Sequence, residues 1–120
     1  RDYIMDVEID DVSCETDDYF CITLYRVIQE CLLNIKKHSQ ATRVLFHCKK
    51  TEQQYEILIQ DNGKGFTMEE AEDKANSHFG LALIHEGVVL LNGTIHISSE
   101  PGQGTTIDIK IPSDLHLAEK

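Results

Sequence analysis

Side chains that carry charge or form hydrogen bonds are concentrated in one short segment of the sequence, QECLLNIKKH, residues 29–38. Glu30 offers a carboxylate, Asn34 an amide, and Lys37 and His38 two basic groups. Glu30 and Asn34 are four residues apart, so on a helix they lie one turn apart on the same flank. This spacing suits a binding site. The alternative is an ordinary solvated helix flank that ends in basic residues.

The helix that must position these groups is indicated by its apolar residues. At about 100° per residue they fall on one arc that would face a core, with Asn34 at its border. These residues are Phe20, Leu24, Val27, Ile28, Cys31 and Ile35. Asp17 and Asp18 can cap the first turn, and we expect the helix to run from about Asp18 to Lys37.

Three glycine-bearing turns follow along the chain: D-N-G-K-G from Asp61, F-G-L from Phe79 and P-G-Q-G-T from Pro101. Glycine allows backbone to approach a ligand closely, but N-G and P-G are also ordinary turn dipeptides. Each turn alone is therefore weak evidence for a site. Neither the Rossmann nor the P-loop glycine pattern is present in the sequence.

In the remaining segments, apolar residues recur with the period of a strand or of a helix. These segments predict five strands and a second helix. We expect strands at Met5 to Ile9, Arg43 to Cys48, Tyr55 to Gln60, Thr94 to Ser98 and Thr105 to Ile111. A second helix should start at Gly80 and end at Asn92-Gly93, and residues 67–77 can form a short acidic helix. This order predicts an α/β (α+β) domain, a two-layer α/β sandwich whose mixed, mostly antiparallel sheet is covered on one face by helices.

Composition narrows the function. The 120 residues are 41% hydrophobic with a formal net charge of −10. We expect one domain over residues 1–120, with a frayed tail from 113, and no direct nucleic-acid binding, because that needs a basic surface. No apolar run reaches the roughly 20 residues of a membrane span and no leader is recognisable, so we expect a cytoplasmic domain. The four cysteines lack a C-x-x-C pair and the histidines lack H-E-x-x-H, so we expect free thiols and no zinc site.

Taken in order, the motifs E-x-x-x-N, D-x-G-x-G, G-L-A and G-x-G-T resemble the N, G1, G2 and G3 boxes of the GHKL superfamily of ATPases and kinases. The finer resemblance is to the catalytic domain of nitrate-sensor-like sensor histidine kinases, through LYRVIQECLLNIKKH at residues 24–38. The resemblance covers about Val7 to Pro112. It implies a Bergerat-type ATP-binding fold, a kinase activity, and ATP and Mg²⁺ as cofactors.

The resemblance also assigns roles. Asn34 would bind Mg²⁺ through its amide oxygen, and Glu30 would hold a metal-bound water or accept a proton during phosphoryl transfer. Lys37 and His38 would donate to phosphate oxygens. Asp61 would accept hydrogen bonds from the adenine amine. The other expected nucleotide contacts are Gly63, Gly65, Gly80, Leu81, Gly102, Gly104 and Thr105, the last as a hydrogen-bond donor. Phe66 should pack beneath the loop.

The sequence departs from the pattern at the second glycine box, where Asn76-Ser77-His78 replaces G-x-G. No segment resembles the dimerisation hairpin that carries the phosphoacceptor histidine. We therefore expect a domain excised from a longer protein, which binds ATP or ADP but does not phosphorylate itself. Its implied partners are that hairpin and a response regulator with helix-turn-helix output; membrane anchoring would reside in other parts of the protein. Two alternatives are an anti-sigma-factor type serine kinase and a degenerate, non-catalytic GHKL module.

Overall fold

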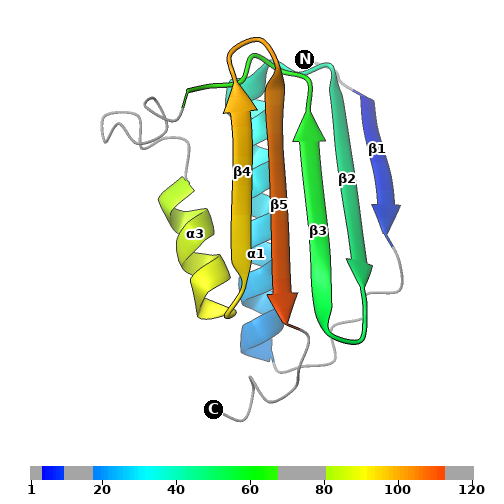
Figure 1. Ribbon diagram of the computed structural model, residues 1–120, viewed down its shortest axis with the longest axis vertical. Coiled ribbons are helices and arrows are strands. Elements are labelled where there is room, and N and C mark those ends of the chain that lie inside the picture. Colours follow the sequence, from blue (N-terminus) through cyan, green and yellow to red (C-terminus); the bar gives the residue numbers. More distant parts are fainter. Residues whose placement is uncertain (1–3, 10–17, 68–80, 113–120) are drawn as a thin grey trace.

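The computed structural model describes residues 4–9, 18–67 and 81–112. Within them the chain forms five strands and three helical segments (Figure 1). The strands are β1 (Ile4–Ile9), β2 (Arg43–Lys50), β3 (Gln54–Asp61), β4 (Thr94–Glu100) and β5 (Gly104–Pro112), and the helices are α1 (Asp18–Asn34), η1 (Ile35–Ser39) and α3 (Leu81–Leu90).

The strands form one mixed sheet in the order β1-β2-β3-β5-β4. β1 pairs with β2 in parallel, while β2–β3, β3–β5 and β4–β5 are antiparallel. β5 is the last strand in the chain, yet it lies between β3 and β4 (Figure 1). The mixed, mostly antiparallel sheet expected from the sequence is confirmed.

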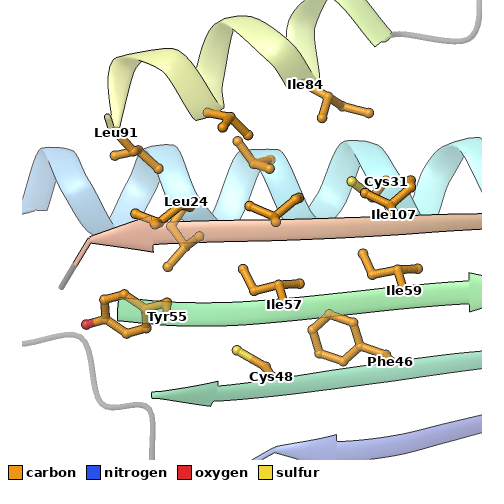
Figure 2. Packing of buried hydrophobic residues seen from close by; sticks show 14 of the residues in the cluster. Leu24, Cys31, Phe46, Cys48, Tyr55, Ile57, Ile59, Ile84, Leu91 and Ile107 are labelled. Carbon is orange, nitrogen blue, oxygen red and sulfur yellow. The ribbon is translucent and has the colours of Figure 1, made fainter. Parts of the chain in front are cut away.

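Both long helices lie on one side of the sheet and bury their apolar residues against it (Figure 2). Because strand side chains alternate between faces, Val44, Phe46 and Cys48 of β2 all face this core. Tyr55 of β3 and the isoleucines of β3 and β5 fill its centre. Ile84 and Val88 of α3 are buried in the same core. The two-layer sandwich is therefore built from the periodicities that the sequence shows.

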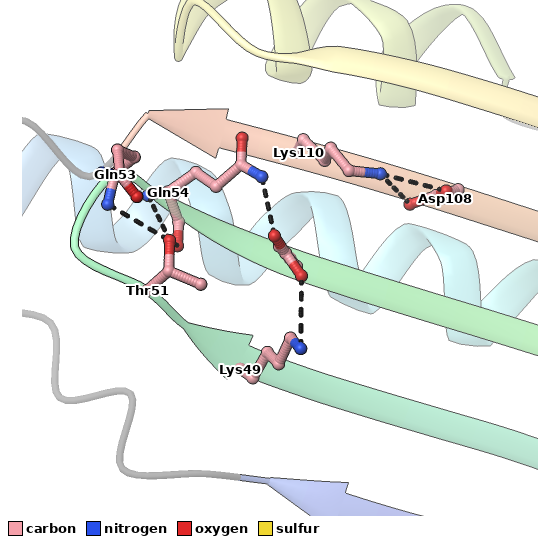
Figure 3. Close-up of polar contacts among 7 residues, drawn as sticks. Lys49, Thr51, Gln53, Gln54, Asp108 and Lys110 are labelled. Atoms are coloured by element: carbon pink, nitrogen blue, oxygen red, sulfur yellow. Dashed lines mark hydrogen bonds and ion pairs between the residues drawn. The ribbon is translucent and has the colours of Figure 1, made fainter.

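The opposite face of the sheet is polar. Lys49 Nζ lies 3.7 Å from a Glu56 carboxylate oxygen across β2 and β3, and Lys110 Nζ lies 3.1 Å from Asp108 Oδ1 (Figure 3). At the β2–β3 turn, Thr51 Oγ1 accepts hydrogen bonds from the backbone N–H groups of Gln53 and Gln54. This face is solvated, and the helices cover only the other one.

Helix α1 does not continue as a regular α-helix to its end. Residues Ile35–Ser39 form a π-helical turn, and Gln40 then takes the left-handed conformation with φ 56°. A π turn makes hydrogen bonds one residue longer than an α turn, so angular positions extrapolated from α1 do not hold beyond Asn34. The sequence-based prediction of a continuous helix to Lys37 was wrong in this respect.

The other predicted elements agree with the structure within one to three residues at each end. The expected acidic helix at 67–77 and the tail from 113 lie outside the described residues. No helix in the described ranges is long and apolar enough to cross a membrane.

The prediction of free thiols holds for two cysteines and fails for a third. Cys31 and Cys48 are free and buried in the core. Cys21 is disulfide-bonded, and its partner lies outside the described residues. Residue spacing alone did not indicate this bond.

Gly104 and Gly102 allow a controlled test of close packing. Both have left-handed φ values, +81° and +80°, but a Cβ at Gly104 would lie 2.1 Å from the Asp61 carbonyl oxygen, whereas a Cβ at Gly102 would meet nothing within 4 Å. Both alanine variants carry the left-handed penalty of about 1–2 kcal/mol. Gly104→Ala should lose about 2 kcal/mol more in urea unfolding because backbone must move. Equal losses for the two variants would show that the close approach is relaxed without cost.

Candidate functional site

A cavity lies between α1 and the end of the sheet where β3 finishes and β5 begins. Its volume is about 40 Å³, enough for a few water molecules. It is lined from three sides of the fold, by Cys31, Asn34, Ile35, Asp61, Gly65, Phe66, Leu81, Ile97, Thr105 and Ile107. The helix, the D-N-G-K-G turn and the last hairpin therefore meet at one place.

The polar rim and apolar floor of the cavity follow from the strand register. Asp61, Thr105 and Ser99 are direct neighbours across β3, β5 and β4, and form one polar row on the core face. The next row inward consists of Phe46, Ile59, Ile107 and Ile97. The core face of the sheet is thus apolar up to its final row, where it presents three oxygen-bearing side chains.

The Asp61 carboxyl is half-buried and held by backbone. Its Oδ1 accepts a hydrogen bond of 2.8 Å from the Gly63 N–H. Burial raises the pKa of Asp61 above its ordinary value of 3.8, while backbone hydrogen bonds from Gly63 and Thr105 act in the opposite direction. The carboxylate is therefore a pre-oriented acceptor whose charge is partly removed from water.

Asn62, which the sequence analysis did not single out, ties this turn to the chain that follows η1. Its Oδ1 accepts hydrogen bonds of 2.9 Å from the backbone N–H groups of both Thr42 and Arg43, and its Nδ2 donates to Thr42 Oγ1. The turn that carries Asp61 is thus fixed to the segment that enters β2. In the sequence, Asn62 was marked only as part of the turn dipeptide N-G.

The D-N-G-K-G turn is also joined to the β4–β5 turn. Gly102 N–H donates to the Lys64 carbonyl at 2.6 Å, and Phe66 N–H donates to Ser99 Oγ at 2.9 Å. Gly65 has φ +66°, and a Cβ there would lie 2.1 Å from the Glu100 carbonyl oxygen. Ser99 is a second residue that sequence reasoning missed, since nothing in its spacing marks it.

Several residues predicted from the sequence do meet at the cavity. Asn34, Asp61, Gly65, Leu81 and Thr105 line it. Gly63 and Gly104 are buried beside it in the turn and at the start of β5, and Phe66 is buried and also lines the cavity. Gly102 is exposed at the tip of the hairpin. Gly80 lies outside the described residues.

Glu30 is not among the residues that line this cavity. It lines a groove of about 470 Å³ between α1 and α3, together with Arg26, Glu86 and Leu90. The cavity and the groove therefore share helix α1, with Asn34 on one and Glu30, one turn earlier, on the other. The sequence analysis had placed both side chains in a single site.

Lys37 is not among the residues that line the cavity. Lys37 is exposed on the π-helical turn, and the side chain of His38 lies outside the described parts of the structure. Among the described residues, no group of three or more His, Cys, Asp and Glu side chains could hold a metal ion.

The thiol of Cys31 lies at the cavity wall but is a poor nucleophile. Burial, with a smaller contribution from the charge of Glu30, raises the pKa of Cys31 to about 12. Because the thiolate is the nucleophilic form, this thiol acts as an apolar wall residue.

Residues 21–115 match the protein family described as histidine kinase-, DNA gyrase B-, and HSP90-like ATPase. The signal transduction histidine-protein kinase/phosphatase DegS of Bacillus subtilis is 41% identical over 106 residues, which cover 84% of this chain and 28% of DegS. The sensor protein VraS of Staphylococcus saprophyticus is 37% identical over 89 residues, covering 74% of this chain and 25% of VraS. The chain thus spans about a quarter of the length of these curated relatives.

Solved structures share the fold. The histidine kinase domain of the blue-light activated histidine kinase from Erythrobacter litoralis EL346 superposes with a TM-score of 0.74 at 18% identity, over 98% of this chain and 56% of that chain. Acinetobacter baumannii histidine kinase AdeS gives 0.72 at 23% identity, over 93% and 55%. At these identities the likeness establishes the fold and its mixed sheet.

The raised pKa of Asp61 predicts a stability effect with a defined sign. The native state holds this proton more tightly than the unfolded chain, so stability from this group is present at low pH and is lost as pH rises through the folded-state pKa. Asp61→Asn removes the partly buried charge. It should therefore raise the unfolding midpoint relative to the wild type at neutral pH, and the difference should vanish below the ordinary value of 3.8.

Thermal unfolding of both proteins between about pH 3 and pH 8 measures this difference. Asp108→Asn is the matched control, because Asp108 lies on the solvated face beside Lys110 and should give no gain at neutral pH. A gain from Asp61→Asn that is the same at every pH would contradict the burial argument.

Proposed function

Because the chain belongs to the histidine kinase-, DNA gyrase B-, and HSP90-like ATPase family, we propose that it is the ATP-binding catalytic domain of a two-component sensor histidine kinase. The domain would transfer the γ-phosphoryl group of ATP to a histidine on a separate dimerisation domain, from which a response regulator receives it. DegS is a signal transduction histidine-protein kinase/phosphatase and VraS a sensor protein, and these relatives favour this activity over the serine-kinase alternative.

The observation that carries the proposal is the Asp61 carboxylate on the rim of an apolar cavity. A carboxylate only accepts hydrogen bonds, and the exocyclic amine of adenine donates them. The apolar floor formed by Ile97 and Ile107 suits a flat aromatic base. Since Gly65 and Gly104 allow backbone to close around this end of the sheet, a base bound there would be largely shielded from water.

The phosphates would extend from the base toward α1 and the start of α3. Free N–H groups at the N-terminus of a helix favour phosphate, so Gly80 and Leu81 are the proposed contacts there, and Gly102 would close the site from the hairpin. Lys37 and His38, both within the turn η1, would donate to phosphate oxygens once these are present.

Mg²⁺ fits the donor set at this end of α1. The described residues contain no cluster of ligands able to hold a metal alone, and Mg²⁺ is commonly held by one or two protein oxygens together with substrate phosphates and water. Asn34 would supply an amide oxygen, and Glu30 would reach the ion through a water molecule. The ion would neutralise charge that develops on the phosphoryl oxygens.

Glu30 is the proposed general base. As the bond between the γ-phosphorus and the ADP oxygen breaks and a bond to the acceptor imidazole nitrogen forms, the imidazole N–H proton must leave. The Glu30 carboxylate would accept it. The groove that Glu30 lines between α1 and α3, about 470 Å³ in volume, supports this role, because it is large enough to admit a side chain of an acceptor domain.

Nucleotide binding tests the proposed base site. The chain should bind ADP with Mg²⁺ far more tightly than GDP, and Asp61→Ala should weaken ADP binding by tens-fold, because leaving a buried donor unpaired costs about 1–3 kcal/mol. Asn34→Ala should weaken binding only when Mg²⁺ is present. Titration calorimetry with and without the metal measures each effect, and equal affinity for ADP and GDP would remove the adenine assignment.

Phosphoryl transfer tests Glu30 separately from Asn34. Supplied with radiolabelled ATP and a dimerisation hairpin from a related sensor kinase, the domain should label the hairpin histidine, while the 120 residues alone accumulate no phosphohistidine. Glu30→Gln should leave nucleotide affinity unchanged and slow labelling about 100-fold or more. If Glu30→Gln instead loses nucleotide binding but labels the hairpin at the normal rate per bound ATP, then Glu30 holds the metal and does not accept the proton.

A further inference from the structure

One hydroxyl group, that of Ser99, connects both sides of the cavity rim. Ser99 Oγ accepts a hydrogen bond of 2.9 Å from Phe66 N–H, lies 3.1 Å from the Gly104 carbonyl oxygen, and lies 2.8 Å from Thr105 Oγ1. The side chain is half-buried. Neither the family match nor the adenine site proposed above gives this residue a role.

The direction of these hydrogen bonds can be worked out by counting hydrogens. A serine hydroxyl has one hydrogen and two lone pairs. The Phe66 N–H takes one lone pair, and the Gly104 carbonyl oxygen can only accept, so all three contacts are hydrogen bonds together only when the Ser99 hydrogen points at Gly104. The contact with Thr105 Oγ1 is then a hydrogen bond only if Thr105 donates its own hydrogen to the second lone pair of Ser99.

Thr105 therefore presents lone pairs, and no hydrogen, to the cavity that it lines. This is opposite to the donation that the family resemblance suggests for Thr105. Its cross-strand neighbour Asp61 is also an acceptor when ionised. Two adjacent acceptors suit a base edge that carries an amine, as adenine does at position 6, and repel a base that carries a carbonyl oxygen there.

We propose that Ser99 is a positioning residue for base selectivity: by taking the Thr105 hydrogen, it fixes Thr105 as a second acceptor beside Asp61, and so excludes 6-oxopurines. The proposal rests on the adenine site of the proposed function. It assigns the selectivity to a hydroxyl that does not touch the base, and it predicts that removing this hydroxyl relaxes selectivity rather than only weakening binding.

The probes are ADP and IDP, whose bases carry an amine and a carbonyl at position 6. In Ser99→Ala the Thr105 hydroxyl is free to rotate and donate to the carbonyl, so the ratio of the IDP to the ADP dissociation constant should fall about tenfold, the size of one hydrogen bond gained. Ser99→Thr keeps the hydroxyl and should retain the wild-type ratio. Thr105→Val removes the second acceptor and should lower the ratio even where Ser99→Ala folds poorly.

The double variant Ser99→Ala/Thr105→Val identifies the cause. If Ser99 acts through Thr105, the Ser99 substitution should leave the ratio unchanged in the Thr105→Val background. A merely structural Ser99 would weaken ADP and IDP equally and lower the unfolding midpoint without moving the ratio, and that result would overturn the proposal. An unchanged ratio in Thr105→Val would also overturn it. Failure of the wild-type chain to bind ADP would instead refute the adenine site itself.

Discussion

The Asp61 carboxylate is held at the last row of an otherwise apolar sheet face, where burial opposes its charge. Such a position is stable only if the charged oxygens keep hydrogen-bond partners. The backbone N–H groups of Gly63 and Thr105 supply them. The tight turn after β3 and the close approach of Gly104 to the Asp61 carbonyl are the geometric conditions for these bonds. The cavity and its polar rim depend on this arrangement, and so does the proposed selectivity for adenine.

Much of the fold could be predicted from periodicity, because burial imposes the same rules on any sequence. The apolar arc of Phe20 to Ile35 specifies α1, and alternation specifies the strands and the face each presents. Asp61, Asn34 and Thr105 were identified from the order of the motifs, and the cavity brings them together. Once the strand register is known, the sequence therefore predicts where the apolar face of the sheet ends in a row of polar side chains.

What could not be predicted depends on contacts between distant segments. The bonds of Asn62 to Thr42 and Arg43 and of Ser99 to Phe66 join residues 19 to 33 positions apart, and no local pattern marks either side chain. The π-helical turn moved Lys37 away from the position that an α-helix would give it. Glu30 was placed with Asn34 by spacing, but the packing of α3 against α1 assigns it to a separate groove.

The position of β5 has a consequence for the order in which the protein becomes functional. β5 follows β3 and β4 in the sequence and so leaves the ribosome after them, yet it separates them in the sheet. Until residues 104–112 insert, Asp61 and Ser99 stand on strands with no ladder between them, and the polar row lacks its middle member. Such long-range pairing forms late, because loop-closure entropy must be overcome first. A nascent chain that lacks β5 therefore lacks the middle of the polar row, and ligand binding at this row would report that β5 has inserted.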